Sequence, residues 1–225
     1  MKLSIILPFY HKVEEFKIAL EFNKRYLTDE MELVIPVDEP DSGEAVVEIL
    51  NAADLPCAWV VRCNMVPHTW RNPSKAINVG IRAASGEYIL VMSPESILAN
   101  DVYSILMNAA NTKTLAIGRV VFHKGNVLVP AQSFADSYRK DLFYGSICGL
   151  RSIFEEVKGY NENYTDWGRD DDDIRIRFRE KGYEVRRIAD AKVLHYEKAE
   201  TRPAKKKDPN LHVPFTNADD WGQDF

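Results

Sequence analysis

The sequence lacks the glycine patterns with which many nucleotide-binding proteins hold phosphates. None of its eleven glycines forms a G-x-G pair, and no G-x-x-x-x-G-K-[ST] segment occurs. Both motifs bring backbone N–H groups close to phosphate oxygens. If this chain binds a phosphorylated ligand, side chains or a metal ion must therefore neutralise the ligand's charge.

The chain is also poor in cysteine and in long apolar runs. Its three cysteines, Cys57, Cys63 and Cys148, form no C-x-x-C pair, which fits thiols in a reducing compartment better than a disulfide framework. No apolar run approaches the ~20 residues of a membrane-spanning helix. The opening MKLSIILPFY has no signal-peptide cleavage pattern and is typical of a core strand. We therefore expect a cytoplasmic protein.

An excess of positive charge is absent too, because the formal net charge is −5 and is spread along the sequence. Binding to nucleic acid as a main partner requires clustered Lys and Arg, so we do not expect it. The run Lys205–Lys207 is interpreted as a solvated part of the tail.

The first half alternates segments of strand and helix character. The expected strands are Leu3–Pro8, Leu33–Val37, Ala58–Arg62 and Glu87–Met92. The expected helices cover about 13–27, 44–53, 72–85 and 100–110. This order predicts an α/β fold with a mainly parallel sheet and helices on both faces.

The second half predicts a smaller antiparallel element. Leu115–His123 and Asn126–Val129 flank Lys124–Gly125, a plausible hairpin. Asp170–Lys181 is expected to be a helix, and Val185–Ile188 and Lys192–Tyr196 to be two strands. From residue 199 onward we expect a tail that is ordered only if it docks, with Trp221 and Phe225 as its apolar anchors.

Polar segments follow several of the expected strands. They are Pro8–Tyr10, Asp38–Glu39, Arg71–Asn78 and Ser93–Ser96. Any α/β domain needs polar loops where it leaves its sheet, so each segment alone is weak evidence. Ligands of open parallel sheets lie beyond the carboxyl ends of the strands, so the joint placement indicates a binding site. Glu95 and His195 are candidate metal ligands, because carboxylate plus imidazole suits Mn²⁺ or a similar ion.

The run Asp170–Asp173 behind Trp167–Gly168 is the sharpest local feature. One interpretation is an acidic helix start, which the helix dipole favours by ~0.3–1 kcal/mol. The other is a general base whose proton affinity is raised by neighbouring carboxylates. In that case Trp167 offers an apolar face on which a sugar ring could stack.

Several segments carry a family resemblance. They are Phe9–Tyr10, VDEPDSGE at 37–44, NPSKAINVGIRAASGEYILVM at 72–92 and GYNENYTDWGRDDDDIRIRFREKGY at 159–183. Together they resemble family 2 glycosyltransferases of the GT-A fold. The last block resembles a motif of β-1,4-galactosyltransferases and polypeptide N-acetylgalactosaminyltransferases. The resemblance implies one domain over 1–198, with a nucleotide-sugar-binding half (1–98), an acceptor-binding half (99–198) and a tail (199–225).

On the donor side, the resemblance implies contacts between the nucleotide and residues after the strands. Those expected to hold the base and ribose are Pro8, Tyr10 and Asp38 or Glu39. Those expected near the base or diphosphate are Arg71, Lys75 and Asn78, and Ser93 is placed with the donor site. The family's D-x-D metal motif is replaced here by Ser93–Pro94–Glu95, so Glu95 can supply the second acid while Ser93 lacks the charge of the first.

On the acceptor side, Asp171 aligns with the family's catalytic base and Asp170 with the acid that binds the acceptor sugar. Trp167 and Gly168 are expected to contact the acceptor, and His195 to complete a Mn²⁺ or Mg²⁺ site with Glu95. The implied reaction is an inverting transfer from a nucleotide-sugar, by resemblance a UDP-sugar, to a glycan hydroxyl. Two alternatives stay open: a degenerate nucleotide- or glycan-binding module, and a nucleotidyltransferase with its metal on Asp170–Asp173.

Overall fold

The computed structural model describes residues 2–122, 142–195, 210 and 212–225. The first half contains β1 (Leu3–Ile6), α1 (Val13–Asn23), the short 3-10 helix η1 (Lys24–Tyr26), β2 (Met31–Val37), α2 (Gly43–Ala52), β3 (Ala58–Cys63), α3 (Ser74–Ala83) and β4 (Tyr88–Met92). The second half contains β5 (Ser96–Leu98), α4 (Val102–Ala109), β6 (Thr114–Phe122), β7 (Ser146–Leu150), α6 (Arg151–Glu156), α7 (Asp170–Glu180) and β8 (Glu184–His195).

The strands form one mixed sheet in the order β3-β2-β1-β4-β7-β6-β8-β5. The pairs β3/β2, β2/β1 and β1/β4 are parallel, whereas β7 is antiparallel to both of its neighbours, β4 and β6. Strand β8 runs parallel to β6 and antiparallel to β5. The expected fold class, a mainly parallel sheet with an antiparallel element in the second half, is therefore confirmed.

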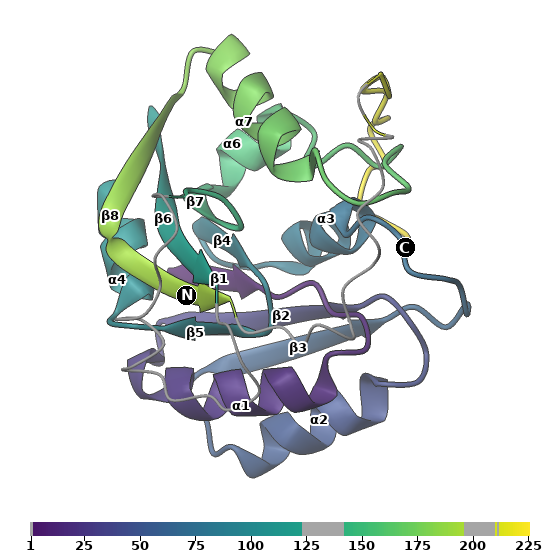
Figure 1. Cartoon of the computed structure of the whole chain (residues 1–225), viewed down its shortest axis with the longest axis vertical. Helices are drawn as coiled ribbons and strands as arrows, with labels where there is room; N and C mark the ends of the chain where they lie inside the picture. Colours follow the sequence, from purple (N-terminus) through teal and green to yellow (C-terminus); the bar gives the residue numbers. More distant parts are fainter. Residues whose placement is uncertain (1, 123–141, 196–209, 211) are drawn as a thin grey trace.

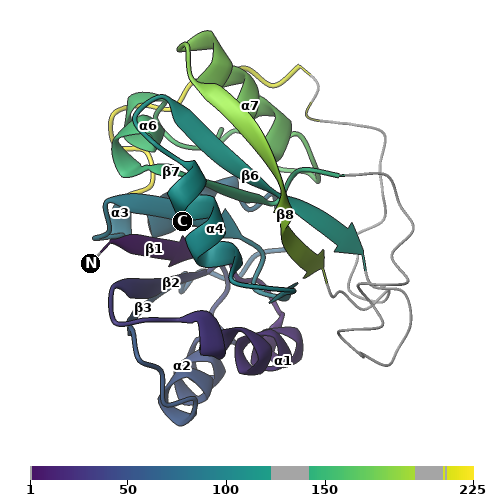
Figure 2. The same cartoon turned by 90° about the vertical axis from the view of Figure 1, so that its left-hand side faces the viewer.

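Helices cover both faces of the sheet because successive strand side chains point in opposite directions. Ile5 packs in the core beneath α1, α2 and α4, and its neighbour Ile6 packs against α3, α6 and α7. Figures 1 and 2 show α1 and α2 on one side of the sheet and α6 and α7 on the other. Burying each such side chain stabilises the fold by about 1.5–3 kcal/mol. The two apolar layers hold the loops at the sheet edge in fixed positions.

Some elements differ from the expectation. Val185–Ile188 and Lys192–Tyr196 were expected as two strands, but β8 is continuous up to His195 and has only a register shift opposite Gly118 and Arg119. Pairing with β6 on both sides of this shift keeps the two parts in one strand, and β5 pairs with the last three residues of β8. Strand β5 and helix α6 were not expected, because each is too short for a clear pattern. The expected hairpin at Lys124–Gly125 lies outside the described residues.

The described part of the C-terminal segment docks on the core, as its aromatic residues indicated. Trp221 is 4% exposed and packs with the α3, α6 and α7 layer. Arg82 of α3 lies over its ring at 4.2 Å and donates from Nε to its carbonyl at 2.9 Å. No helix in the described part of the chain has the length and apolar character needed to cross a membrane.

Candidate active site

The loops that carry the candidate residues meet at one edge of the sheet. The parallel strands β1, β2 and β4 end there, followed by Tyr10, Asp38 and Ser93 (Figure 1). Because β7 is antiparallel to β4, it begins at the same edge, and its Ser146 pairs with Met92. The edge therefore combines residues from both halves of the chain.

Asp38 is the centre of a charged cluster in the loops after β2 and β3. Arg71 binds its carboxylate in bidentate fashion, with Nε 2.8 Å from Oδ2 and one terminal nitrogen 2.7 Å from Oδ1. Asn64 donates to Oδ1 at 2.9 Å, and His68 Nε2 lies 3.1 Å from the same oxygen. Asp38 is buried, while Arg71 and His68 are partly exposed. The cluster presents a fixed, balanced group of donors and acceptors to a ligand.

Glu39, the other candidate of this turn, is used by its own loop. One carboxylate oxygen accepts from the backbone N–H groups of Asp41 at 2.7 Å and Ser42 at 3.0 Å. Burial alone raises the pKa of Glu39, but hydrogen bonds from Ser42 and Asp41 outweigh it and lower the pKa overall. Of the two predicted residues, Glu39 shapes the turn and Asp38 is the one joined to Arg71 in the cluster.

Tyr10 closes the cluster from the β1 side. Its hydroxyl donates to the carbonyl of His68 at 3.0 Å, and the two rings lie 5.6 Å apart. Burial raises the pKa of Tyr10, and the charges of Glu39 and Asp38 add to the rise. Pro8 is half-buried two residues earlier. The predicted residues of this edge, Pro8, Tyr10, Asp38 and Arg71, therefore come together.

Helix α3 starts close to the expected position but uses its asparagines differently. The backbone N–H and the hydroxyl of Ser74 donate to the side-chain oxygen of Asn72, at 3.1 and 2.7 Å. Pro73 is the N-cap residue, and Lys75 is half-buried. Asn78, expected near the donor, is fully buried, and its side chain binds the backbone of Tyr160 and the carboxylate of Glu162. In this structure Asn78 joins α3 to the loop after α6.

The four aspartates at the start of α7 divide into two pairs. Asp172 forms an ion pair with Arg175, and Asp173 with Arg177 at 2.8 Å, at the i,i+3 and i,i+4 spacings of helix surface pairs. Asp170 and Asp171 instead have raised pKa values. The run therefore contains two aspartates that form ion pairs within α7 and two whose pKa values are raised.

Asp171 has the environment of a general base. Burial raises its pKa to about 7, and the charge of Asp170 adds to the rise. Arg175 and the backbone N–H of Gly145 partly offset the shift. Gly145 precedes β7, so its contact places Asp171 at the end of β4. A base that titrates near neutral pH is matched to accepting a proton from a hydroxyl group.

Two buried asparagines hold the loop before α7 from opposite sides. Asn72 Nδ2 lies 3.0 Å from the carbonyl oxygen of Asp166 and 3.3 Å from that of Gly168. Asn210 Nδ2 lies 2.7 and 2.9 Å from the same two oxygens. Sequence reasoning missed Asn210, because nothing in a Pro- and Lys-rich tail signals a partner more than 40 residues away.

The loop so held presents the predicted acceptor residues at the surface. Trp167 is 47% exposed, the highest fraction of any tryptophan in the described part of the chain. Gly168 and Arg169 have φ angles of 91° and 76°, so the backbone reverses sharply between Trp167 and α7. The reversal brings the exposed indole close in sequence to the half-buried carboxylates of Asp170 and Asp171 at the start of α7.

Glu95 and His195 come together as predicted, and a third group joins them. His195 Nε2 lies 3.3 Å from Glu95 Oε1, since Ser96 pairs with His195 between β5 and β8. The ammonium of Lys12 lies 3.6 Å from the same oxygen. Within the residues that the structure describes, no three His, Cys, Asp or Glu side chains form a metal-binding group. The donors present, one carboxylate and one imidazole beside an ammonium, fit a divalent metal poorly.

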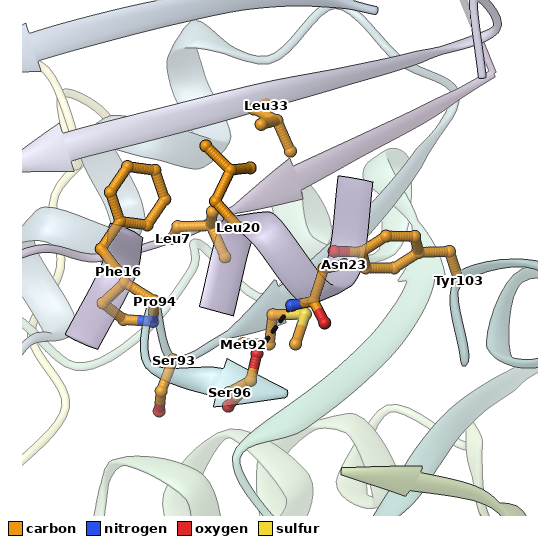
Figure 3. A pocket seen from close by; sticks show the side chains of 10 residues that line it. All are labelled: Leu7, Phe16, Leu20, Asn23, Leu33, Met92, Ser93, Pro94, Ser96 and Tyr103. Carbon is orange, nitrogen blue, oxygen red and sulfur yellow. Dashed lines mark hydrogen bonds between the residues drawn. The ribbon is translucent and has the colours of Figure 1, made fainter. Parts of the chain in front are cut away.

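A small pocket lies under the turn that carries Ser93, and its lining is mostly apolar (Figure 3). Asn23 of α1 is one of the residues that line the pocket. Its side chain donates to the carbonyl of Ser96 at 2.7 Å and accepts from the N–H of Leu98 at 2.9 Å. These two bonds fix α1 to β5. The pocket is therefore part of the packing that sets the Ser93–Ser96 turn.

Comparisons with known proteins agree with this fold. Residues 4–157 match glycosyl transferase family 2. The chain belongs to that family. Residues 129–200 match a second family, described as the N-terminal domain of galactosyltransferase. The matches cover both the donor-side loops and the acidic start of α7.

Individual relatives are distant. Bovine β-1,4-galactosyltransferase 1 is 24% identical over 214 residues, which is 93% of this chain but 44% of that protein. GalNAc-T7, solved with UDP, GalNAc and Mn²⁺, has a TM-score of 0.66 at 13% identity and covers 94% of this chain and 46% of its own. The catalytic domain of Drosophila β1,4-galactosyltransferase 7, solved with xylobiose, has a TM-score of 0.59 at 18% identity, over 92% and 76%. The architecture is accordingly GT-A-like.

Proposed function

We propose that this protein is an inverting glycosyltransferase that moves a sugar from a nucleotide-sugar to a hydroxyl group of a glycan. The observation that carries the proposal is Asp171, whose pKa of about 7 suits a base, at the same sheet edge as the Asp38–Arg71 cluster. The chain spans 44% of the length of its bovine relative. We therefore argue the activity from its own residues.

In the proposed reaction the acceptor oxygen attacks the anomeric carbon from the side opposite the leaving group. The new bond forms between that oxygen and the anomeric carbon, while the bond to the β-phosphate oxygen breaks. Asp171 takes the acceptor proton, and the nucleoside diphosphate leaves with the bonding electrons. A positioned base of this kind contributes typically ~10²–10⁴-fold to the rate.

In this proposal the nucleotide-sugar and the acceptor bind to different sides of the site. The bidentate pair of Asp38 and Arg71 provides fixed hydrogen-bonding groups for a nucleoside, and UDP is our choice because GalNAc-T7 was solved with it. Trp167 provides an exposed ring on which an acceptor sugar can stack. Asp170, bound by Asn72 Nδ2 at 3.4 Å, lies beside the base and is suited to bind an acceptor hydroxyl.

The proposal is tested by incubating the protein with UDP-sugars and GDP-sugars and an array of glycan acceptors, with EDTA or Mn²⁺. We expect release of one nucleoside diphosphate and a product whose anomeric configuration, read by NMR, is inverted. Asp171→Asn should abolish product and keep nucleotide binding.

Product with retained configuration would contradict the role of Asp171. Nucleotide binding without turnover in the whole array would favour a binding module over an enzyme. Pyrophosphate release from a nucleoside triphosphate would indicate a nucleotidyltransferase instead.

A further inference from the structure

A lysine from the start of α1 lies beside the turn after β4, where a metal-dependent transferase needs acidic ligands. Ser93 is neutral, and Glu95 is the one acid of the Ser93–Pro94–Glu95 turn. Lys12 Nζ lies 3.6 Å from Glu95 Oε1, and His195 Nε2 lies 3.3 Å from it. One carboxylate oxygen therefore faces two nitrogen groups.

The net charge of Glu95 and Lys12 differs from that of two acidic side chains that bind a metal ion. Two acids carry −2 and attract a divalent cation, whereas Glu95 and Lys12 together carry −1 + 1 = 0. A divalent ion on Glu95 would lie within a few ångströms of the Lys12 ammonium and be repelled by it. A neutral group with an ammonium at its surface attracts phosphate oxygens directly.

Packing keeps Lys12 at this place. Lys12 is the N-cap residue of α1, directly after the loop of Tyr10 and His11. Its side chain is 14% exposed and that of Glu95 is 6% exposed. The hydrogen bond from Asn23 to Ser96, drawn in Figure 3, and the one from the N–H of Leu98 to Asn23 fix α1 against β5, the strand that follows Glu95. The ammonium therefore sits at the rim of the edge where Asp38 and Asp171 lie.

We infer that Lys12 binds the diphosphate of the nucleotide-sugar and stabilises it as it leaves, in place of a divalent metal. Glu95 and His195 position the ammonium. The inference rests on the proposed function. When the bond between the anomeric carbon and the β-phosphate oxygen breaks, the negative charge gained by that oxygen is paired with the Lys12 ammonium. Lys12 keeps its proton, and the acceptor proton goes to Asp171.

Calorimetric titration tests this with UDP and uridine as probes, in EDTA and in Mn²⁺. The wild-type protein should bind UDP in EDTA, and Mn²⁺ should change the affinity less than about threefold. Lys12→Met, which keeps the apolar stem, should weaken UDP binding at least tenfold and leave uridine binding unchanged. Lys17→Met, at an exposed position of α1, is the matched control and should bind like the wild type.

Glu95→Gln separates the two explanations. If Lys12 binds the diphosphate, removing a negative charge beside it should leave UDP binding in EDTA unchanged or stronger. UDP binding that requires Mn²⁺ and is lost in Glu95→Gln would overturn the inference and leave the proposed function intact. Failure to bind UDP, GDP or uridine under either condition would overturn the proposed function as well.

Discussion

Asp38 and the pair of Asp170 and Asp171 lie at the same sheet edge but have opposite environments. Asp38 is bound by Arg71, Asn64 and His68, all within 33 residues of it in the sequence. Asp171 lies beside a second acid, and burial raises its pKa to about 7. The environment of an aspartate, and not its residue type alone, therefore decides which role its carboxylate can have. A carboxylate matched by a guanidinium suits fixed binding, whereas one crowded by a like charge suits proton transfer.

The two groups also differ in how they are built. The Asp38 cluster consists of loops that follow neighbouring parallel strands. The loop before α7 is held by Asn72 and Asn210, and Asp171 is bound by Gly145. The loop before α7 and the position of Asp171 therefore depend on distant parts of the chain.

The largest expected effect comes from removing the base. Asp171→Asn should lower kcat for sugar transfer by about 10²–10⁴-fold, because an amide cannot accept the acceptor proton. The affinity for UDP should stay within about twofold. Asp172→Asn is the matched control, since Asp172 is exposed and paired with Arg175. The kcat of Asp172→Asn should remain within about threefold of the wild-type value. Equal losses of kcat in both variants would contradict the assignment of different roles to Asp171 and Asp172.

Breaking the donor cluster should produce the opposite pattern. Arg71→Ala removes the guanidinium and leaves the buried Asp38 carboxylate without its bidentate partner. If UDP thereby loses one hydrogen bond to a charged group, worth about 1.5–3 kcal/mol, it should bind about 10- to 100-fold more weakly. The pH dependence of kcat should not change. Arg62→Ala, at an exposed position of β3, controls for loss of a nearby positive charge. An unchanged affinity for UDP in Arg71→Ala would remove the cluster from the donor site.

Loosening the loop before α7 should have a smaller effect. Asn210→Ala removes two hydrogen bonds to the carbonyls of Asp166 and Gly168. Since each contributes about 1 kcal/mol, we expect kcat to fall about tenfold with UDP affinity unchanged. Asn51→Ala, at an exposed position of α2, is the control. Lower UDP affinity without a change in kcat would contradict a role for Asn210 on the catalytic side.

The smallest effect is on stability. The raised pKa of Asp171 means that the folded protein holds this proton more tightly than the unfolded chain, whose pKa is near 3.8. The group therefore costs stability as pH rises from about 4 to 7, and the cost is full above 7. Asp171→Asn removes it, so thermal unfolding at pH 8 should shift upward by about 2–4 °C per kcal/mol recovered. At pH 4 the melting temperatures should agree.

The meeting of the loops after β1 and β2 could be predicted from the sequence, because these strands have clear apolar patterns. To place Tyr10, Asp38 and Arg71 near one another, only the rule that parallel strands end at one edge of the sheet was needed. Asn78 was expected near the donor, and in the structure its side chain donates to the backbone of Tyr160. Local order could not reveal that partner, 82 residues away.

The arrangement at the start of α7 could be predicted only in part. The acidic run Asp170–Asp173 was recognised in the sequence. The positions of Arg175 and Arg177, three and four residues after Asp172 and Asp173, also indicate that these two aspartates form ion pairs. Lys12 and Asn210 carried no local signal. A lysine before a helix and an asparagine in a polar tail look like surface residues until the fold brings Glu95 and Gly168 to them.

The central claim is that one carboxyl group at this edge is ready to accept a proton near neutral pH. It is tested most directly, without any substrate, by titrating the ¹³C-labelled aspartate carboxyl groups by NMR in the wild type, Asp171→Asn and Asp172→Asn. The account predicts one carboxyl signal that titrates near pH 7 in the wild type and in Asp172→Asn and is absent from Asp171→Asn. If every carboxyl group titrates below pH 5, Asp171 is not the base and the account fails.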